Sequence, residues 1–226
     1  MERGKLIVLE GLDGSGKATQ TGILCSEIRK YNRSVCRVSF PDYNEPSSLL
    51  VKMYLNSEFG QRPEDVNPYA AGSFYAVDRF ASYMKFWNER YQRGQIIIAD
   101  RYTTSNAVYQ MGKLPQKDWD EYLNWLEDYE YCKLDLPRPD LVLYLDMPIE
   151  ISQKFMTRRY DGKESKKDLH EKNIELLKKC REAALFAAEK LNWKILQCSK
   201  NNEPKSIDEI KENILNIVKG EILEEC

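Results

Sequence analysis

The sequence predicts an α/β fold in which a five-stranded parallel sheet is flanked by helices. The first observation behind this prediction is a set of five short runs that are apolar enough to be buried on both faces. Such runs are typical of strands in a parallel sheet. They are residues 5–10, 35–40, 95–99, 140–146 and 193–197.

The second observation is that helical stretches alternate with these strands. This alternation indicates right-handed crossovers that carry the chain from one strand to the next. The stretches are about residues 17–31, 67–92, 115–131, 148–158, 168–191 and 204–223. No linker or repeat interrupts the pattern, so we expect a single domain over residues 1–226.

The composition narrows the classes of partner. A net charge of −2 argues against a general nucleic-acid or membrane surface and favours small-molecule partners. The six cysteines show no C-x-x-C spacing, and a chain with 42% hydrophobic residues does not need disulfides to fold. With neither a cleavable leader nor a membrane-length apolar run, the expected location is the cytoplasm.

The first strand runs directly into a glycine loop that opens the first helix. Glycines at 11, 14 and 16 let the backbone turn tightly, and Lys17 can reach the terminal phosphates of a nucleotide. A bare loop turn would also contain glycines, but the strand, the Gly-Lys pair and the helix occur together. The chain therefore has a three-layer P-loop fold in this prediction, and its ATP-binding residues are Gly11, Leu12, Asp13, Gly14, Ser15, Gly16, Lys17, Ala18 and Thr19.

The third strand ends in Asp100-Arg101-Tyr102. Carboxyl ends of parallel strands meet at the ligand-binding edge of the sheet, so this pair of charges is expected beside the glycine loop. Asp100 can hold Mg²⁺, most simply through water, and Arg101 can bind a phosphate with two hydrogen bonds. A surface ion pair is the alternative. Asp146 ends the fourth strand but has less weight as a metal ligand.

A basic segment at about residues 157–168 lies between two helices. Its ordinary interpretation is a solvated corner, but a nucleotide loop elsewhere in the chain favours a mobile lid whose cations close over phosphates. The candidate cations are Arg158, Arg159 and Lys163. His170 is the only histidine, which excludes a cluster of histidines as a catalytic or metal site.

Several motifs in order give the chain a family resemblance. The loop GLDGSGKATQ, FPDY at 40–43, FYAVDR at 74–79, DRYTTSNAVYQ from residue 100 and PDLVLYLD resemble the motifs of thymidylate kinases over nearly the whole chain. The resemblance implies transfer of the γ-phosphate of ATP to dTMP with Mg²⁺, and a homodimer. It implies that the glycine loop and Lys17 hold ATP, while Arg79 and Arg101 hold the acceptor phosphate.

The resemblance also assigns an acceptor site. Asp13 would face the sugar or phosphate, Tyr75 with Phe74 would stack on thymine, and Tyr109 would crowd the 2′ position of the sugar. Ser105 and Asn106 would contact the base edge. The whole implied set is Asp13, Phe40, Tyr43, Phe74, Tyr75, Arg79, Arg101, Ser105, Asn106 and Tyr109. From spacing alone, Phe74 and Tyr109 fit ordinary helix packing equally well.

Three alternatives stay open at this point. The acceptor could be another deoxynucleoside monophosphate or a nucleoside. The chain could be a nucleotide-dependent switch, although it has no N-K-x-D base-reading motif. Because Ala18 replaces the usual Ser or Thr that binds Mg²⁺, it could also be a relative that binds nucleotide without catalysis.

The Ala18 departure generates a first prediction. Thr19 lies about 100° around the helix from Ala18 and does not replace the missing hydroxyl directly. We expect Ala18→Ser to lower the Mg²⁺ concentration that gives half-maximal rate. The measurement is a Mg²⁺ titration of turnover, and an unchanged midpoint would mean that the hydroxyl is not needed.

Overall fold

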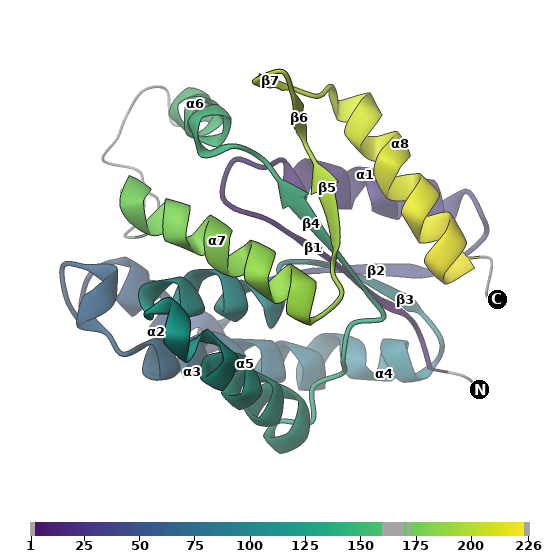
Figure 1. The fold of residues 1–226 in the computed structure, drawn as a ribbon. Coiled ribbons are helices and arrows are strands. Elements are labelled where there is room, and N and C mark those ends of the chain that lie inside the picture. The colour runs from purple at the N-terminus through teal and green to yellow at the C-terminus, as the bar shows by residue number, and fades with distance from the viewer. Residues whose placement is uncertain (1–2, 160–169, 171–172, 224–226) are drawn as a thin grey trace.

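The computed structural model describes residues 3–159, 170 and 173–223. Its centre is a five-stranded sheet in the order β2-β3-β1-β4-β5, with every pairing parallel (Figure 1). The strands are β1 (Leu6–Glu10), β2 (Val35–Ser39), β3 (Ile96–Asp100), β4 (Leu141–Asp146) and β5 (Lys194–Gln197). This sheet confirms the predicted fold class, and each strand lies within two residues of its predicted position.

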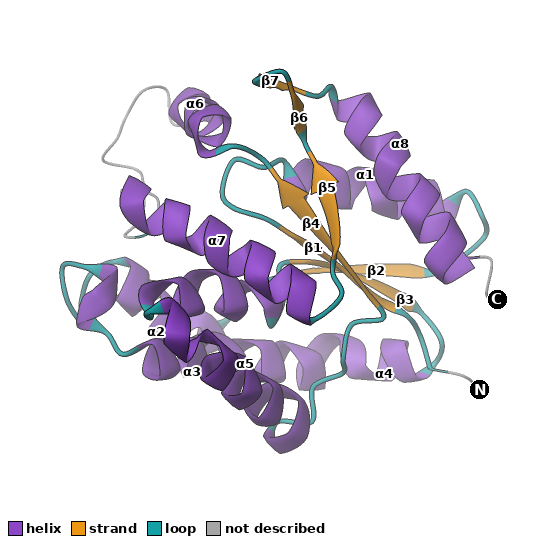
Figure 2. Cartoon of the chain, in the orientation of Figure 1, coloured by secondary structure: helices purple, strands orange, loops and turns teal. Residues whose placement is uncertain are grey.

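Helices cover the two faces of the sheet, as Figure 2 shows. Helices α1 (Lys17–Arg29) and α8 (Ile207–Val218) pack on one face through an aliphatic cluster that includes Leu24, Ile28 and Ile214. The other face is covered by α3 (Pro68–Ser82), α4 (Asn88–Gln92), α5 (Trp119–Glu127) and α7 (Ile174–Lys190). Because the three inner strands are buried on both faces, their sequences are almost uninterrupted apolar runs.

Two of the predicted helical stretches are not continuous α-helices. The stretch 67–92 is divided by a π-helical turn, Tyr83–Trp87, and the stretch 115–131 ends in another, Asp128–Lys133. Several of the described helical segments were not predicted, and the two longest of them are α2 (Leu49–Leu55) and the π-turn Asn106–Gln110 that follows β3. With seven and five residues, both are too short to show a helical period in the sequence.

The last part of the chain adds a small hairpin. Strands β6 (Ser199–Lys200) and β7 (Glu203–Pro204) pair antiparallel just before α8. Helix α6 (Ile149–Arg159) contains the beginning of the predicted lid, and residues 160–168 lie outside the described residues. Among the helices of the described ranges, none combines the length and apolarity that crossing a membrane requires.

The strand order places the ligand edge at the middle of the sheet. β1 lies between β3 and β4, so the chain reverses its winding direction on either side of it. Ligands of such sheets bind beyond the carboxyl ends of the strands at this reversal. The loop after β1 and the residues after β3 meet at that point.

Candidate active site

The glycine loop has the backbone geometry that its sequence predicts. Gly14 and Gly16 adopt φ of +81° and +90°, which favours glycine, and Gly16 precedes the first residue of α1. A Cβ on Gly14 would lie 2.5 Å from the carbonyl oxygen of Ser152, so the loop is also closed against α6. Ser15 Oγ is buried and has no hydrogen-bond partner among the described residues, as expected for a loop that binds a phosphate.

Lys17 starts α1 and points back into the loop. Its Nζ donates a hydrogen bond of 2.9 Å to the carbonyl of Leu12. Burial, with the nearby charge of Arg101, lowers the pKa of Lys17 to about 8, although Asp13 and Glu10 oppose this shift. The ammonium is therefore held at the N-terminus of a helix, where a bound polyphosphate would accept its remaining hydrogen bonds and balance its charge.

A buried carboxylate at the end of β1 joins the loop to β3. Glu10 has no exposed surface, and its Oε1 accepts from the backbone N–H of Gly11 at 2.9 Å. Its Oε2 accepts from Thr104 and Ser105, each at 2.7 Å, and Arg101 Nη1 lies 3.4 Å from Oε1. Glu10 was not predicted from the sequence, where its one visible signal is a charge at the end of an apolar strand.

Arg101 completes this connection from the other side. It adopts φ of +68°, an uncommon conformation for a residue other than glycine, and its Nη2 donates to Asp13 Oδ1 at 2.5 Å. Tyr109 donates to the other oxygen of Asp13 at 2.8 Å and accepts from Arg101 at 3.1 Å. The predicted residues Asp13, Arg101 and Tyr109 are thus in direct contact.

The charge state of Asp13 follows from these neighbours. Burial alone would raise the pKa of its carboxyl, but the charges of Arg101 and Lys17, with the hydrogen bond from Tyr109, hold that pKa well below its usual range. Asp13 is therefore an ionised hydrogen-bond acceptor. It does not supply a proton near neutral pH.

Two hollows meet at this point. We call the first the inner cavity; its walls include Tyr75, Arg79, Asn106 and Gln110. We call the second the loop cleft; it runs along the glycine loop past Asp100 to Lys205 and Ile207. The residues that line both are Asp13, Phe40, Pro41, Tyr43 and Arg101.

The far wall of the inner cavity is a buried polar network. Arg79 donates to Glu130 through Nε at 2.7 Å and Nη2 at 2.5 Å, and both side chains are at most 1% exposed. Asn106 Nδ2 donates to Glu130 at 2.9 Å and to the carbonyl of Gly72 at 3.0 Å. Glu130 therefore holds Arg79 and Asn106 side by side.

The predicted aromatic residues occupy different places. Tyr75 lines the inner cavity, whereas Phe74 packs against Phe59 with ring centroids 5.7 Å apart and is not among the described residues that line the cavity. Phe40 and Tyr43 lie at the boundary of the two hollows. The Phe40–Pro41 peptide bond is cis, a point that the sequence left undecided.

The turn that carries Tyr43 is held by a buried carboxylate. Asp78, in α3, accepts hydrogen bonds from the backbone N–H of Asp42 at 2.9 Å and from Ser47 at 2.6 Å. The motif at residues 74–79 thus supplies a ring to the cavity and also fixes the neighbouring loop.

The two strand-end carboxylates have different surroundings. Asp100 lines the loop cleft, where Arg37 Nη2 lies 3.7 Å from its Oδ2. Asp146 instead accepts two hydrogen bonds from Arg181, at 2.7 and 2.8 Å, and one from Gln197. Its oxygens are engaged in an ion pair that ties β4 to α7.

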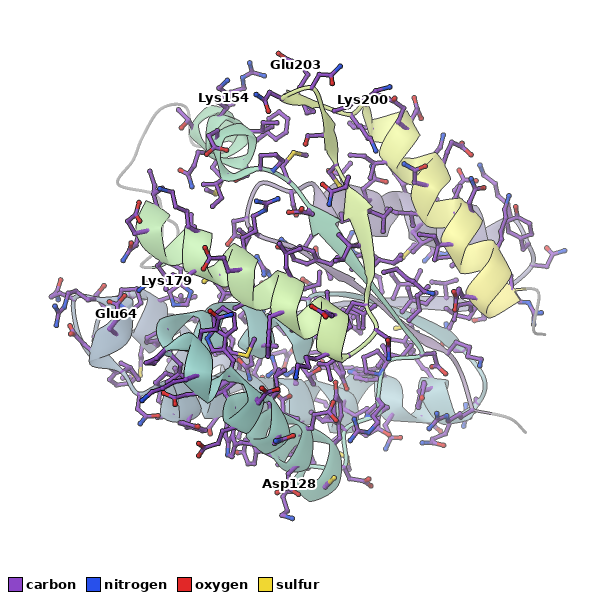
Figure 3. The ribbon with its side chains drawn as sticks, in the orientation of Figure 1. Glu64, Asp128, Lys154, Lys179, Lys200 and Glu203 are labelled. Atoms are coloured by element: carbon purple, nitrogen blue, oxygen red, sulfur yellow. The ribbon has the colours of Figure 1, made fainter. Side chains whose placement is uncertain are left out.

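The predicted lid cations are only partly described. Arg158 is exposed near the end of α6, Arg159 is the last residue of that helix, and Lys163 lies outside the described residues. Figure 3 shows two further cations at this end of the molecule, Lys154 on α6 and Lys200 on the β6–β7 hairpin.

Gln110 and His170 also line the inner cavity, and neither was predicted to belong to the site. Gln110 is 1% exposed, and its Oε1 has no hydrogen-bond partner among the described residues. His170 is 4% exposed and lines the same cavity, with its ring stacked on Tyr109. A single glutamine or histidine in a sequence gives no sign of such a position.

The fold and site together are those of a P-loop nucleotide kinase: a glycine loop that opens a helix adjoins a second, polar cavity, and Arg101 lines both hollows. The model of the thymidylate kinase family matches residues 9–213, and the chain belongs to this family.

The matches to individual relatives cover most of the chain. A probable thymidylate kinase of Pyrococcus abyssi is 30% identical over 223 residues, which cover 98% of each sequence. A thymidylate kinase of Mycobacterium tuberculosis is 29% identical over 185 residues, covering 80% of this chain and 84% of the relative. The solved thymidylate kinase of Candida albicans has a TM-score of 0.72 at 24% identity, covers 96% of this chain and 92% of its own, and supports the fold.

The buried Arg79–Glu130 pair generates a stability prediction. Glu130→Ala leaves the Arg79 guanidinium buried without its counter-charge, so the free energy of unfolding should fall by about 3–5 kcal/mol. Chemical denaturation measures this loss. Glu127→Ala is the control, because it breaks the more exposed Arg138–Glu127 pair and should cost less than about 1 kcal/mol. Equal losses in the two variants would contradict the prediction.

Proposed function

We propose that the chain transfers the γ-phosphate of ATP to dTMP, giving dTDP and ADP. One observation carries this proposal: the loop cleft and the inner cavity meet at Asp13 and Arg101, so two phosphate-bearing ligands would face each other there. Membership of the thymidylate kinase family gives the same activity, an ATP-dependent dTMP kinase.

The reaction needs charge neutralisation more than acid–base chemistry. Two anionic phosphates repel each other, and Lys17 and Arg101 offset that repulsion where the hollows meet. The acceptor phosphate is already an anion, so no protein base is required. Asp13 remains ionised and, by the family resemblance, accepts a hydrogen bond from the acceptor's sugar.

The hydrogen-bonding groups on the far wall of the inner cavity complement those on the edge of thymine. Both hydrogens of Asn106 Nδ2 are used by Glu130 and Gly72, which leaves Oδ1 to accept from the N3–H of thymine. Glu130 balances the charge of Arg79 and leaves its Nη1 to donate to O4. We propose this base contact for Arg79 in place of the phosphate contact that the resemblance implied.

The remaining acceptor contacts keep their proposed roles. Tyr75 would stack on the base, Tyr109 would exclude a ribose 2′-hydroxyl, and Tyr43 would contact the acceptor phosphate. Ser105 is held by Glu10, so it orders Arg101 as well as bordering the base. Phe74, which does not line the inner cavity, would act only indirectly, by packing beside Tyr75.

We propose Mg²⁺ as the cofactor, bound with ATP in the loop cleft. The residues fit a nucleotide-borne ion: Asp100 and Asp13 line the cleft, but the described ranges contain no cluster of three residues that could hold a metal by themselves. Asp100 would order the water shell, and the bound ion would neutralise phosphate charge. At least one cation of the segment 157–168 would contact the transferred phosphoryl group.

We propose a homodimer that acts in the cytoplasm. Exposed apolar side chains lie on α2, on the adjacent helix α3 and on the π-helical turn that follows α3. They are Leu49, Leu50, Val77, Phe80 and Met84. A second copy of the chain would cover them. A sedimentation mass near 26.5 kDa would contradict the dimer. The five cysteines of the described ranges are unpaired, as suits a reducing compartment.

A substrate panel tests the proposed function. ADP release is measured with dTMP, dUMP, dCMP, dGMP and thymidine at saturating ATP. Cytosine reverses the donor and acceptor at positions 3 and 4, so kcat/KM for dCMP should be at least about 100-fold below that for dTMP. Thymidine, which has no phosphate for Arg101, should be inactive. No turnover of dTMP alongside turnover of another acceptor would contradict the assignment.

A further inference from the structure

A chain of hydrogen bonds runs from His170, which lines the inner cavity, to two residues outside that lining, and none of the three has a role in the reaction described above. Lys113 Nζ donates to Tyr54 Oη at 2.6 Å, and Tyr54 Oη lies 2.7 Å from Nε2 of His170. The three residues come from the turn Met111–Lys113, from α2 and from the segment before α7. Tyr54 and His170 are almost fully buried.

The direction of these hydrogen bonds follows from their chemistry. A lysine ammonium only donates, so Tyr54 Oη accepts from Lys113 and has its own hydrogen to give. Of the two acceptors at known distance, His170 Nε2 at 2.7 Å is much nearer to Tyr54 Oη than the carbonyl of Pro63 at 3.5 Å, and we assign the hydrogen to His170 on that ground. His170 is then neutral, with its proton on Nδ1.

The His170 ring passes this constraint to the site. It stacks on Tyr109 with the ring centroids 5.5 Å apart and the planes 14° from parallel. The Tyr109 hydroxyl donates to Asp13, where the inner cavity meets the loop cleft. A shift of the His170 ring would therefore displace the group that orients Asp13.

We propose that Lys113, Tyr54 and His170 form one positioning unit for the acceptor, in which Lys113 orders Tyr54, Tyr54 orders the His170 ring, and that ring holds Tyr109 against Asp13. The inference rests on the proposed function, because it takes the inner cavity as the dTMP site. It assigns the unit to acceptor binding and not to ATP binding.

The unit has charged and titratable neighbours on several sides. Burial, with the charges of Lys113 and Arg101, lowers the pKa of His170 to about 3 against the opposing effect of Asp13. The ring stays neutral, as the hydrogen-bond direction requires. Burial lowers the pKa of Lys113 to about 7, although Cys180 of α7 and Glu64 oppose this shift.

Because the pKa of Lys113 lies near neutrality, the hydrogen bonding of the unit depends on pH. Below about pH 7, Lys113 is an ammonium and donates to Tyr54. Above it, the neutral amine has a lone pair that competes with His170 for the Tyr54 hydrogen. The ordering of His170 therefore weakens as the pH rises through neutrality.

Three substitutions test the unit: Tyr54→Phe, Lys113→Met and His170→Phe, which retains an aromatic ring. At pH 6, where Lys113 is an ammonium, each should raise KM for dTMP about threefold to tenfold, while kcat and KM for ATP stay within about twofold. The double variant Tyr54→Phe/Lys113→Met should be no worse than the more affected single variant, because both changes interrupt the same chain.

Matched controls come from outside the site. Tyr91→Phe removes a buried hydroxyl that has no hydrogen-bond partner among the described residues, and Lys117→Met removes an exposed lysine. Both should behave as wild type. The ratio of KM for dTMP in Lys113→Met to that in wild type should be largest near pH 6 and approach one above pH 8, a comparison in which the ionisation of dTMP cancels.

The outcomes separate this inference from the proposed function. A wild-type protein that phosphorylates dTMP, with variants whose KM for dTMP is unchanged or whose KM for ATP rises equally, would overturn the positioning unit alone. Additive effects in the double variant would also overturn it. A wild-type protein with no dTMP kinase activity would overturn the proposed function and, with it, this inference.

Discussion

The buried carboxylate of Glu10 is the interaction on which the rest of the site depends. It joins the end of β1 to the residues after β3 through Gly11, Thr104, Ser105 and Arg101. A charge without exposed surface is stable only when its oxygens are satisfied, and here four donors surround it. The glycine loop and Arg101 are therefore fixed relative to one another before any ligand binds, which is the preorganisation that phosphoryl transfer requires.

A second buried carboxylate repeats this arrangement at the other end of the inner cavity. Glu130 holds Arg79 and Asn106 as Glu10 holds Arg101 and Ser105. One acid thus orders the groups that would bind phosphates, and the other orders those that would contact a base. Because each arginine carries its own counter-charge, the site presents directed hydrogen-bond donors without a large surplus of positive charge.

The sequence predicted those features that have local signals. Uninterrupted apolar runs revealed the strands, glycine spacing revealed the loop, and the Asp100-Arg101 pair marked the ligand edge. Glu10, Glu130 and His170 were missed because their partners are distant: Thr104 is 94 residues from Glu10, and Arg79 is 51 residues from Glu130. A lone charged or aromatic residue has the same appearance in a sequence whether it is exposed or joins such a network.

The most direct test of this account is a double-mutant cycle on Glu10 and Thr104, measured as kcat/KM for dTMP. Glu10→Gln replaces one acceptor oxygen with an amide donor, and losing charged hydrogen bonds of this kind should reduce kcat/KM about 10- to 100-fold. Thr104→Val should cost less, and the double variant should be no worse than Glu10→Gln alone. Wild-type kcat/KM in Glu10→Gln, or fully additive losses, would contradict the claim that Glu10 organises the site.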